Sequence, residues 1–321
     1  MTIAVEDKLL AYIKKQNYAK SLNVTWFGGE PLLNFGSIKR LSEKFLKLNV
    51  TYSASIITNG YLLTPTIATQ LEKLKISYVQ VTIDGPQTLH DSRRCLKNGF
   101  GTFDRITSNL KKAAEICKNV SFAVRVNLDR SNHEKFIELR QQIIDWGLTN
   151  IKISPSFVVD YSVEQNNCDI MSATQQKDFL INLSLVKGIR YNKFYPSHNR
   201  FECAVRNMNS FVIGPEGELY KCWNDVGNKN RVYGTIDNQI INESLMLEYL
   251  IGADPLEDKR CLDCFLFPRC GGGCPYNRLW INHHNTKQSF CPLHKNFLDE
   301  LLWAHYKTKN LRTQNENNHE S

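Results

Sequence analysis

A regular alternation of strand-like and helix-like segments limits the fold of residues 1–190 more than any other feature. Five short runs rich in β-branched and aromatic residues alternate with segments whose apolar residues recur at helical spacing. The runs lie at residues 23–27, 51–58, 77–84, 120–129 and 150–154. Strands that are separated by helices pair in parallel through right-handed crossovers. The sequence therefore predicts an α/β domain with a parallel sheet, either open or closed into a barrel.

Local signals place the beginnings of individual helices. Thr64 and Pro65 suit the N-cap and the first position of a helix, and Asn132 suits the cap of a later helix that ends near Gly147. An apolar stripe with helical spacing begins within the first few residues. The first element is therefore predicted to be a helix, with no strand before it.

Residues 191–306 follow a different pattern, made of short runs, glycines and cysteines. This pattern predicts a small α+β domain that a metal supports and that closes with a helix near residues 293–306. The last residues, 307–321, are polar and lack an apolar face. We expect this tail to be disordered.

Charge and hydropathy argue against two classes of partner. The 321-residue chain has a formal net charge of +8, but its Lys and Arg residues are spread over predicted helix faces, which favours solvated surfaces over a nucleic-acid site. No run approaches the roughly 18 apolar residues of a membrane span. The charged start of the chain also differs from a secretory signal. We therefore expect a cytoplasmic protein with no nucleic-acid or membrane partner.

The ten cysteines are distributed unevenly along the chain. Cys95, Cys117 and Cys168 are scattered, and each is interpreted as a buried thiol that acts as a small apolar residue. The other seven lie in the last 120 residues, where a reducing compartment disfavours disulfides and the clustering indicates metal binding or catalysis. They are Cys203, Cys222, Cys261, Cys264, Cys270, Cys274 and Cys291.

The spacing Cys-x2-Cys-x5-Cys-x3-Cys at residues 261–274 fits either a four-cysteine zinc site or an iron–sulfur cluster. Seven thiols do not divide into two four-cysteine zinc sites, and His294 is the nearest residue that could complete a second one. Iron–sulfur clusters tolerate an incomplete set of protein ligands more readily. The ending Cys270-x3-Cys274-Pro275 also resembles a bacterial ferredoxin motif, whose last cysteine ligates the other cluster. We therefore favour two clusters, with zinc as the alternative.

The complete cysteine pattern resembles the SPASM domain of radical S-adenosylmethionine enzymes. The match comprises Cys203-x13-Gly217-x4-Cys222, then Cys261-x2-Cys264-x5-Cys270-x3-Cys274, and finally Cys291. The resemblance implies two auxiliary 4Fe-4S clusters. It assigns Cys203, Cys222 and Cys274 to the first cluster, and Cys261, Cys264, Cys270 and Cys291 to the second. No cysteine lies between residues 203 and 222, so the resemblance leaves the fourth ligand of the first cluster open.

The first predicted strand end resembles the same family. Gly28, Gly29 and Glu30, in WFGGEPLL, match its Gly-Gly-Glu motif. Glycines let a ligand approach the backbone, and a carboxylate can accept charge-assisted hydrogen bonds from the ammonium group of S-adenosyl-L-methionine. The alternative interpretation of this short string is a plain turn between strand and helix.

The next strand ends, ITNG and VTIDGPQTLHDSRR, resemble the cofactor-contacting loops of these enzymes. The resemblance implies that Thr82 and Asp84 approach the ribose or carboxylate of the cofactor. Arg125, in VRVN, is expected to pair with that carboxylate. The alternatives are strand and turn roles for Thr82 and Asp84, and a structural ion pair for Arg125.

One motif of the family is missing. Its members carry Cys-x3-Cys-x2-Cys after the first barrel strand, which holds the cluster that cleaves the cofactor to a 5′-deoxyadenosyl radical. This chain has no such motif and no cysteine before Cys95. We expect a sequence truncated at its start, without the first strand and the cluster loop, and unable as written to cleave the cofactor. A non-catalytic homologue is the alternative.

The resemblance implies a partial (β/α)6 TIM-like barrel that lacks its first strand, over residues 1–190, followed by the SPASM domain. It further implies a maturase that modifies a peptide or protein substrate and takes electrons from a reductant such as flavodoxin or ferredoxin. Trp223 follows Cys222 at the place where sulfatase maturases carry an aspartate, which argues against that substrate. The alternatives are an iron–sulfur electron-transfer protein without radical chemistry and a zinc-binding module.

Overall fold

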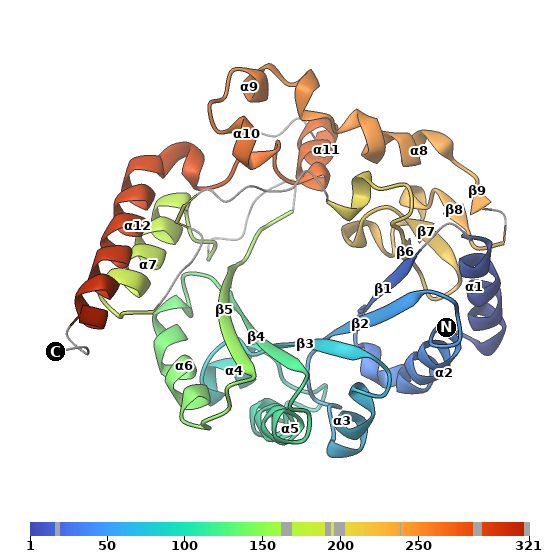
Figure 1. Cartoon of the computed structure of the whole chain (residues 1–321), viewed down its shortest axis with the longest axis horizontal. Coiled ribbons are helices and arrows are strands. Elements are labelled where there is room, and N and C mark those ends of the chain that lie inside the picture. Colours follow the sequence, from blue (N-terminus) through green and yellow to red (C-terminus); the bar gives the residue numbers. More distant parts are fainter. Residues whose placement is uncertain are drawn as a thin grey trace. The chain divides into compact units, whose positions relative to one another are not determined.

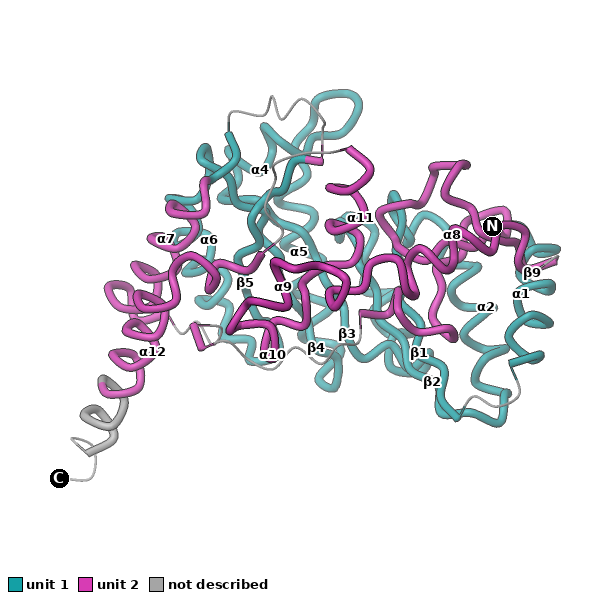
Figure 2. The backbone as a smooth tube through the Cα atoms, turned by 90° about the horizontal axis from the view of Figure 1, so that it is seen from above, with its two compact units in different colours: residues 1–160, 166–171 teal, residues 161–165, 172–321 magenta. Residues whose placement is uncertain are grey.

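The structure of the chain is a computed structural model. It describes residues 1–16, 20–161, 169–189, 194–195, 203–237, 239–284 and 291–317. The chain forms two compact units (Figure 2). Unit 1 comprises residues 1–160 and 166–171, and unit 2 comprises residues 161–165 and 172–321. Cys168 lies outside the described residues, so its predicted burial stays a prediction.

Unit 1 is built on a five-stranded parallel sheet in which each strand pairs with the next strand along the chain (Figure 1). The strands are β1 (Ser21–Trp26), β2 (Thr51–Thr58), β3 (Ile76–Thr82), β4 (Ser121–Leu128) and β5 (Ile151–Phe157). This sequential parallel order confirms the predicted α/β class, and all five predicted strands are present. The sheet keeps the carboxyl ends of its strands along one edge.

Helices cover one face of this sheet. They are α1 (Ile3–Lys15), α2 (Phe35–Phe45), α3 (Pro65–Leu71), α4 (Gln87–Arg93), α5 (Phe103–Ile116) and α6 (Phe136–Ile144). Figure 1 shows α2, α3, α5 and α6 outside the arc of strands. Leu41, Val79, Leu110 and Val124 are fully buried in this layer. The predicted cap of α3 is confirmed, because the Thr64 side chain accepts a hydrogen bond from the Ile67 amide at 3.4 Å.

The opposite face of the sheet is polar, which is unusual because parallel sheets are normally apolar on both faces. In-register pairing places the polar side chains together on this face. They include Asn23, Thr25, Ser53, Ser55, Gln80, Thr82, Arg125, Asn127, Lys152 and Ser154. The charged side chains of this face within the strands, Arg125 and Lys152, are both basic and exposed. We call this surface the polar sheet face.

Unit 2 contains a small antiparallel sheet with strand order β6-β7-β8-β9. The strands are β6 (Val212–Ile213), β7 (Glu218–Tyr220), β8 (Gly234–Thr235) and β9 (Gln239–Ile240). The helices are α7 (Ala173–Leu185), α8 (Glu243–Leu247), α9 (Lys259–Leu262), α10 (Phe267–Cys270), α11 (Pro275–His284) and α12 (His294–Asn317). Val205, Cys222, Tyr249, Ala253 and Leu279 form a small buried core in this unit. Short elements around cysteines agree with the predicted α+β domain.

Three predictions differ from the structure. The helix α7 was expected in the barrel domain, but it belongs to unit 2 because it packs against α12, where Ser184 and Thr308 hydroxyls lie 3.3 Å apart. The expected disordered tail continues α12 to Asn317, because residues 307–317 contain good helix formers and no Gly or Pro. Cys95 is exposed, whereas Cys117 is buried as predicted and donates to the Ala68 carbonyl.

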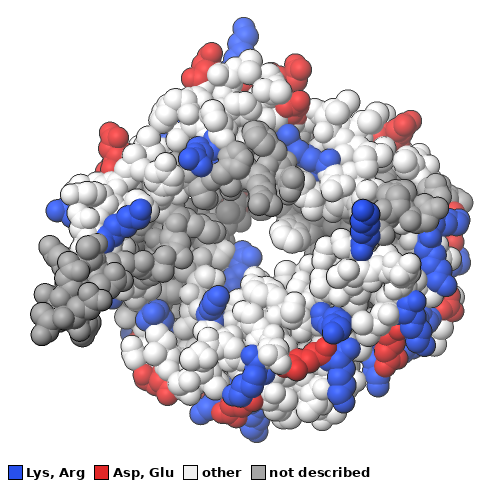
Figure 3. All heavy atoms as spheres, in the orientation of Figure 1, with Lys and Arg blue, Asp and Glu red and all other residues white. Residues whose placement is uncertain are grey.

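The surface charge agrees with the expectation of solvated faces. Figure 3 shows Lys and Arg interspersed with Asp and Glu over the visible face, without one large basic patch. None of the helices in the described parts of the chain is both long enough and apolar enough to span a membrane.

Candidate cofactor edge and cysteine groups

Glu30 lies after β1 at the carboxyl edge of the sheet, where β2 fixes its orientation. Its Oε1 accepts hydrogen bonds from the Thr58 hydroxyl at 2.6 Å and the Leu32 amide at 3.0 Å. Its Oε2 accepts from the Asn59 amide at 2.7 Å. A carboxylate has about four acceptor sites. Glu30 is therefore held in one orientation and retains capacity for a ligand donor.

The two glycines before Glu30 are exposed. A Cβ atom built on Gly28 or Gly29 meets no heavy atom within 4 Å. Gly28 has φ +148°, a conformation that side-chain-bearing residues rarely adopt. The backbone beside Glu30 thus faces open space, as a turn that admits a ligand requires.

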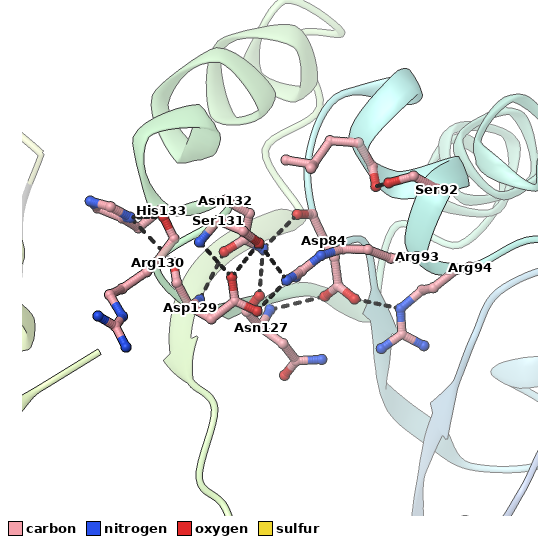
Figure 4. Close-up of polar contacts among 11 residues, drawn as sticks. Asp84, Ser92, Arg93, Arg94, Asn127, Asp129, Arg130, Ser131, Asn132 and His133 are labelled. Atoms are coloured by element: carbon pink, nitrogen blue, oxygen red, sulfur yellow. Dashed lines mark hydrogen bonds and ion pairs between the residues drawn. The ribbon is translucent and has the colours of Figure 1, made fainter. Parts of the chain in front are cut away.

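Asp84 follows β3 and is 4 % exposed. Its Oδ2 accepts from Arg94 Nε at 2.6 Å, and its Oδ1 accepts from the Asn127 amide at 3.1 Å. Both carboxylate oxygens therefore have partners within unit 1 (Figure 4). This geometry favours the alternative of a positioning role, in which Asp84 ties the loop after β3 to the end of β4.

His90 supports the same loop from α4. It is fully buried, and its Nδ1 accepts from the Asp84 amide at 3.2 Å. Its Nε2 must then carry the proton, which it can donate to the Thr102 hydroxyl at 3.1 Å. Burial lowers the pKa of His90 and keeps the ring neutral.

Thr82 and Arg125 lie opposite each other on the polar sheet face, because β3 and β4 pair them in register. Arg125 donates through Nε to the Asn127 side-chain oxygen at 3.0 Å. That bond uses Nε, and Arg125 is exposed, so its two terminal nitrogens can serve a planar anion. The structure thus brings Thr82 and Arg125 together, and links Arg125 to Asp84 through Asn127.

A second acidic centre, which was not predicted, lies beyond β4. Asp129 is buried, and its Oδ1 accepts from the Ser131 amide at 2.9 Å and the Ser131 hydroxyl at 2.7 Å. Its Oδ2 is paired with Arg93 from α4 (Figure 4). Asn132 donates to the carbonyls of Asp84 and Asn127 at 2.9 and 2.7 Å. The Asp-x-Ser-Asn string after a strand is the sequence signal that could have indicated this turn.

Asp129 gives a pH prediction. Burial raises the pKa of Asp129, but hydrogen bonds from Ser131 and Arg93 outweigh it, so the net pKa lies below the ordinary 3.8. A lowered pKa contributes stability above the unfolded-state value, and this stability is lost as pH falls through the folded-state value. We expect Arg93→Met to unfold at a higher pH than wild type in an acid titration below pH 5. Lys135→Met, which removes an exposed ion pair with Glu138, is the control and should leave the midpoint unchanged.

The seven clustered cysteines of unit 2 fall into two groups by their mutual electrostatic effects. Burial, together with the nearby Cys274 and Cys203, raises the pKa of Cys222 to about 12. Burial, together with the nearby Cys291 and Cys261, raises the pKa of Cys270. The hydrogen bond to Cys264, together with the nearby Cys291 and Cys261, raises the pKa of Lys295. We call Cys203, Cys222 and Cys274 the first cysteine group, and Cys261, Cys264, Cys270 and Cys291 the second.

The second cysteine group is surrounded by hydrogen-bond donors. Arg278 Nη2 lies 3.1 Å from Cys261 Sγ, and Lys295 Nζ lies 3.2 Å from Cys264 Sγ. The amides of Gly272 and Gly273 donate to Cys270 and oppose the rise in its pKa. N–H donors and cations stabilise thiolates and tune the clusters they hold. The donor set thus fits thiolates that bind an iron–sulfur cluster.

The glycine run makes this arrangement possible. Gly271, Gly272 and Gly273 have φ values of 62°, 83° and 75°, so all three are in the left-handed region. A Cβ on Gly272 would lie 2.2 Å from Pro255 Cβ. Only glycine therefore allows the chain to turn its amides toward Cys270 at this place.

Within the described ranges, no three His, Cys, Asp or Glu side chains are close enough together to hold a single metal ion. Next to the first cysteine group, Asp225 is buried and accepts from the Tyr249 hydroxyl at 2.7 Å. Burial raises the pKa of Asp225 although Arg231 lies nearby. Trp223 itself is exposed. Asp225 thus lies inward against Tyr249, whereas Trp223 reaches the surface.

Residues 2–143 match the model of the Radical SAM superfamily. The chain is 24% identical to the radical SAM cyclopropyl synthase TigE of Paramaledivibacter caminithermalis, over 92% of this chain and 63% of that protein. It is 23% identical to a serine-type anaerobic sulfatase-maturating enzyme of Klebsiella aerogenes, over 84% of this chain and 71% of the relative. A cysteine-type anaerobic sulfatase-maturating enzyme of Clostridium novyi is 24% identical, over 86% of this chain and 79% of the relative.

The fold is also similar to a solved structure. The structure described as native anSMEcpe with bound AdoMet superposes with a TM-score of 0.68 at 18% identity, covering 100% of this chain and 91% of that chain. This likeness bears out the expected partial barrel fold. Residues 2–143, which carry β1 to β4 and the candidate cofactor residues, are thus similar to the Radical SAM superfamily.

Proposed function

We propose that this chain is of the radical S-adenosylmethionine maturase type, which modifies a peptide or protein, and that it carries two auxiliary 4Fe-4S clusters in unit 2. As printed, without Cys-x3-Cys-x2-Cys, it is not expected to cleave the cofactor itself. The observation that carries the proposal is the separation of seven thiols into two groups, of which the second is surrounded by N–H donors. A four-iron cluster places several atoms between its thiolates, so its ligands stand farther apart than those of a single ion. The first cysteine group supplies three ligands and leaves one iron for another ligand.

We assign the carboxyl edge of unit 1 to S-adenosyl-L-methionine. The cofactor, when bound to a reduced cluster, supplies a carbon radical that removes hydrogen from a substrate. Glu30 accepts hydrogen bonds from its ammonium group, Arg125 binds its carboxylate, and Gly28 and Gly29 give it access to the backbone. Asp84 acts indirectly, by holding the loops on which Thr82 and Arg125 lie. The printed sequence contains no Cys-x3-Cys-x2-Cys, so these residues are assigned to the cofactor alone.

A peptide substrate is supported by the polar sheet face and by the relatives. The Ser53 hydroxyl donates to the Asn23 side-chain oxygen at 2.5 Å. Hydroxyl and amide side chains on this face have the same capacity to pair with the groups of a bound peptide. Two of the relatives are named as sulfatase-maturating enzymes and one as a cyclopropyl synthase, so their names do not agree on one reaction. Trp223 and the inward-facing Asp225 separate this chain from the sulfatase type. A reductant of the flavodoxin or ferredoxin class would supply electrons.

Metal analysis of anaerobically reconstituted protein tests the clusters. We expect a brown protein with about eight iron and eight sulfide per chain, which corresponds to two four-iron clusters. Cys203→Ser should remove about half of both, and so should Cys264→Ser, because each variant affects a different cluster. Cys95→Ser is the control, since Cys95 is exposed in unit 1, and should change neither.

Other outcomes would favour the alternatives. A colourless protein with stoichiometric zinc would overturn the cluster assignment in favour of a zinc-binding module. A protein with both clusters but no measurable affinity for S-adenosyl-L-methionine would favour a non-catalytic electron-transfer protein.

A further inference from the structure

The two cysteine groups differ in the charge around them. Resting on the proposed function, we infer that Arg278 and Lys295 set the reduction potential of the cluster held by the second cysteine group, and place it above that of the first.

Lys295 is the exposed cation of the second cysteine group. It lies in the first turn of α12, and its Nζ is 3.2 Å from Cys264 Sγ. The neighbouring acid, Asp263, is exposed to solvent. Lys295 thus brings a full positive charge to a ligand sulfur, and its exposure makes it replaceable without opening the core.

Arg278 is the buried cation of the same group. It is 3% exposed, and its Nη2 contacts Cys261 Sγ at 3.1 Å and the Gly272 carbonyl at 2.7 Å. Its Nη1 pairs with Asp258 at 2.5 Å. Asp258 also pairs with Arg260 at 2.7 Å. Two guanidinium groups therefore share the Asp258 carboxylate beside Cys261.

The first cysteine group has no comparable support in the described part of the chain. The backbone amide of Asn224 donates to Cys222, but no side-chain N–H of a described residue reaches its sulfurs. Lys221, although next to Cys222, donates its ammonium protons to the carbonyls of Asn207 and Ser210, both at 2.7 Å.

Both acids and bases lie near Cys222, but among the described residues no cation contacts its sulfur. Asp225 and Glu248 share one cation, Arg231, at 3.4 and 2.8 Å. Two carboxylates thus face a single guanidinium, which is the reverse of the arrangement at Asp258. His283, which is paired with Glu248, is half exposed and lies at the end of α11.

Reduction adds one electron, and therefore one negative charge, to a cluster and its thiolates. Cations and N–H donors beside the sulfurs stabilise the reduced state more than the oxidised state, and so raise the reduction potential. Buried negative charge has the opposite effect. The second cysteine group combines two cations with two glycine amides, whereas the first has one amide and, among the described residues, no cation in contact with its sulfurs. The second cluster is therefore the better electron acceptor of the pair.

Redox titration followed by electron paramagnetic resonance tests this ordering in the reconstituted full chain. Wild type should show two midpoint potentials, and the higher one should vanish in Cys264→Ser but persist in Cys203→Ser. Lys295→Gln should weaken the reduction equilibrium of the second cluster about tenfold. This change lowers the higher midpoint potential by about 59 mV for a one-electron couple. The lower potential should not move.

Lys307→Gln is the matched control, because Lys307 is an exposed lysine on the same helix. Its ammonium group lies over the Trp303 ring. It should move neither potential. Arg278→Lys, which keeps the charge and loses the fork, should lower the higher potential less than Lys295→Gln does. Unchanged potentials in Lys295→Gln, or equal shifts of both, would overturn this inference with the clusters intact. A protein without iron and sulfide would overturn the proposed function as well.

Discussion

Gly272→Ala is expected to destabilise unit 2 by about 3 kcal/mol, through two additive effects. Gly272 has φ +83°, and placing a side chain in the left-handed region costs roughly 1–2 kcal/mol. The added Cβ would also lie 2.2 Å from Pro255 Cβ and 3.2 Å from Arg278 Nη2. Overpacking of this kind costs roughly 1–3 kcal/mol. Because the Gly272 amide donates to Cys270, the same change should loosen the second cysteine group.

Gly227→Ala separates the two effects. Gly227 lies in the same unit with φ +92°, but a Cβ there meets no atom within 4 Å. This variant should therefore show only the backbone cost of about 1–2 kcal/mol. Urea unfolding followed by tryptophan fluorescence measures both variants, and the rate of iron release reports on the second cysteine group. Equal destabilisation by the two variants would contradict the predicted contact with Pro255.

The strands of unit 1 could be predicted because their signals are local. Runs rich in β-branched and aromatic residues identified β2 at residues 51–58. They identified the other strands to within three residues at either end. Pattern and topology rules together then gave the parallel order. The partner of a helix is not a local property. The helix α7 lies within residues 1–190, which were assigned to the first domain, and only the folded chain shows that it packs on α12 in unit 2.

The candidate cofactor edge was predictable in its positions but not in its bonds. Glu30, Thr82 and Arg125 all lie at strand ends or on the polar sheet face, as parallel pairing requires. The sequence could not show that both oxygens of Asp84 are used by Arg94 and Asn127, because these partners are 10 and 43 residues away. Such contacts depend on how loops fold back, which single-sequence patterns do not record.

The two cysteine groups also depend on contacts that the sequence pattern does not show. Their spacing alone left zinc and iron open, and the assignment of ligands came from resemblance. The donors around the sulfurs, Arg278 and Lys295, lie 17 and 31 residues from their partners. They carry no recognisable motif, and yet they distinguish the two groups. Functional tuning by distant residues is thus the part of this site that only the folded structure reveals.

Glu30→Ala is expected to lower the affinity for S-adenosyl-L-methionine by at least about tenfold. A hydrogen bond to a charged group contributes roughly 1.5–3 kcal/mol, and about 1.4 kcal/mol corresponds to a tenfold change. The variant also leaves the Thr58 hydroxyl and the Asn59 amide without their acceptor, so the loop after β2 loses its fixed orientation. Both effects act on the same ligand-binding edge, and therefore in the same direction.

Isothermal titration of S-adenosyl-L-methionine into the reconstituted chain measures this effect. Glu30→Gln should also bind weakly, because its amide group places a donor against the N–H of Asn59 or against the donors of Thr58 and Leu32. Glu138→Ala is the control, since Glu138 is an exposed acid on α6 that pairs only with Lys135 among the described residues. Unchanged affinity in Glu30→Ala, with a thermal midpoint equal to that of wild type, would remove Glu30 from the cofactor site. A loss of affinity that is confined to the Glu30 variants would instead show that ligand binding depends on this carboxylate, which Thr58 and Asn59 hold in place.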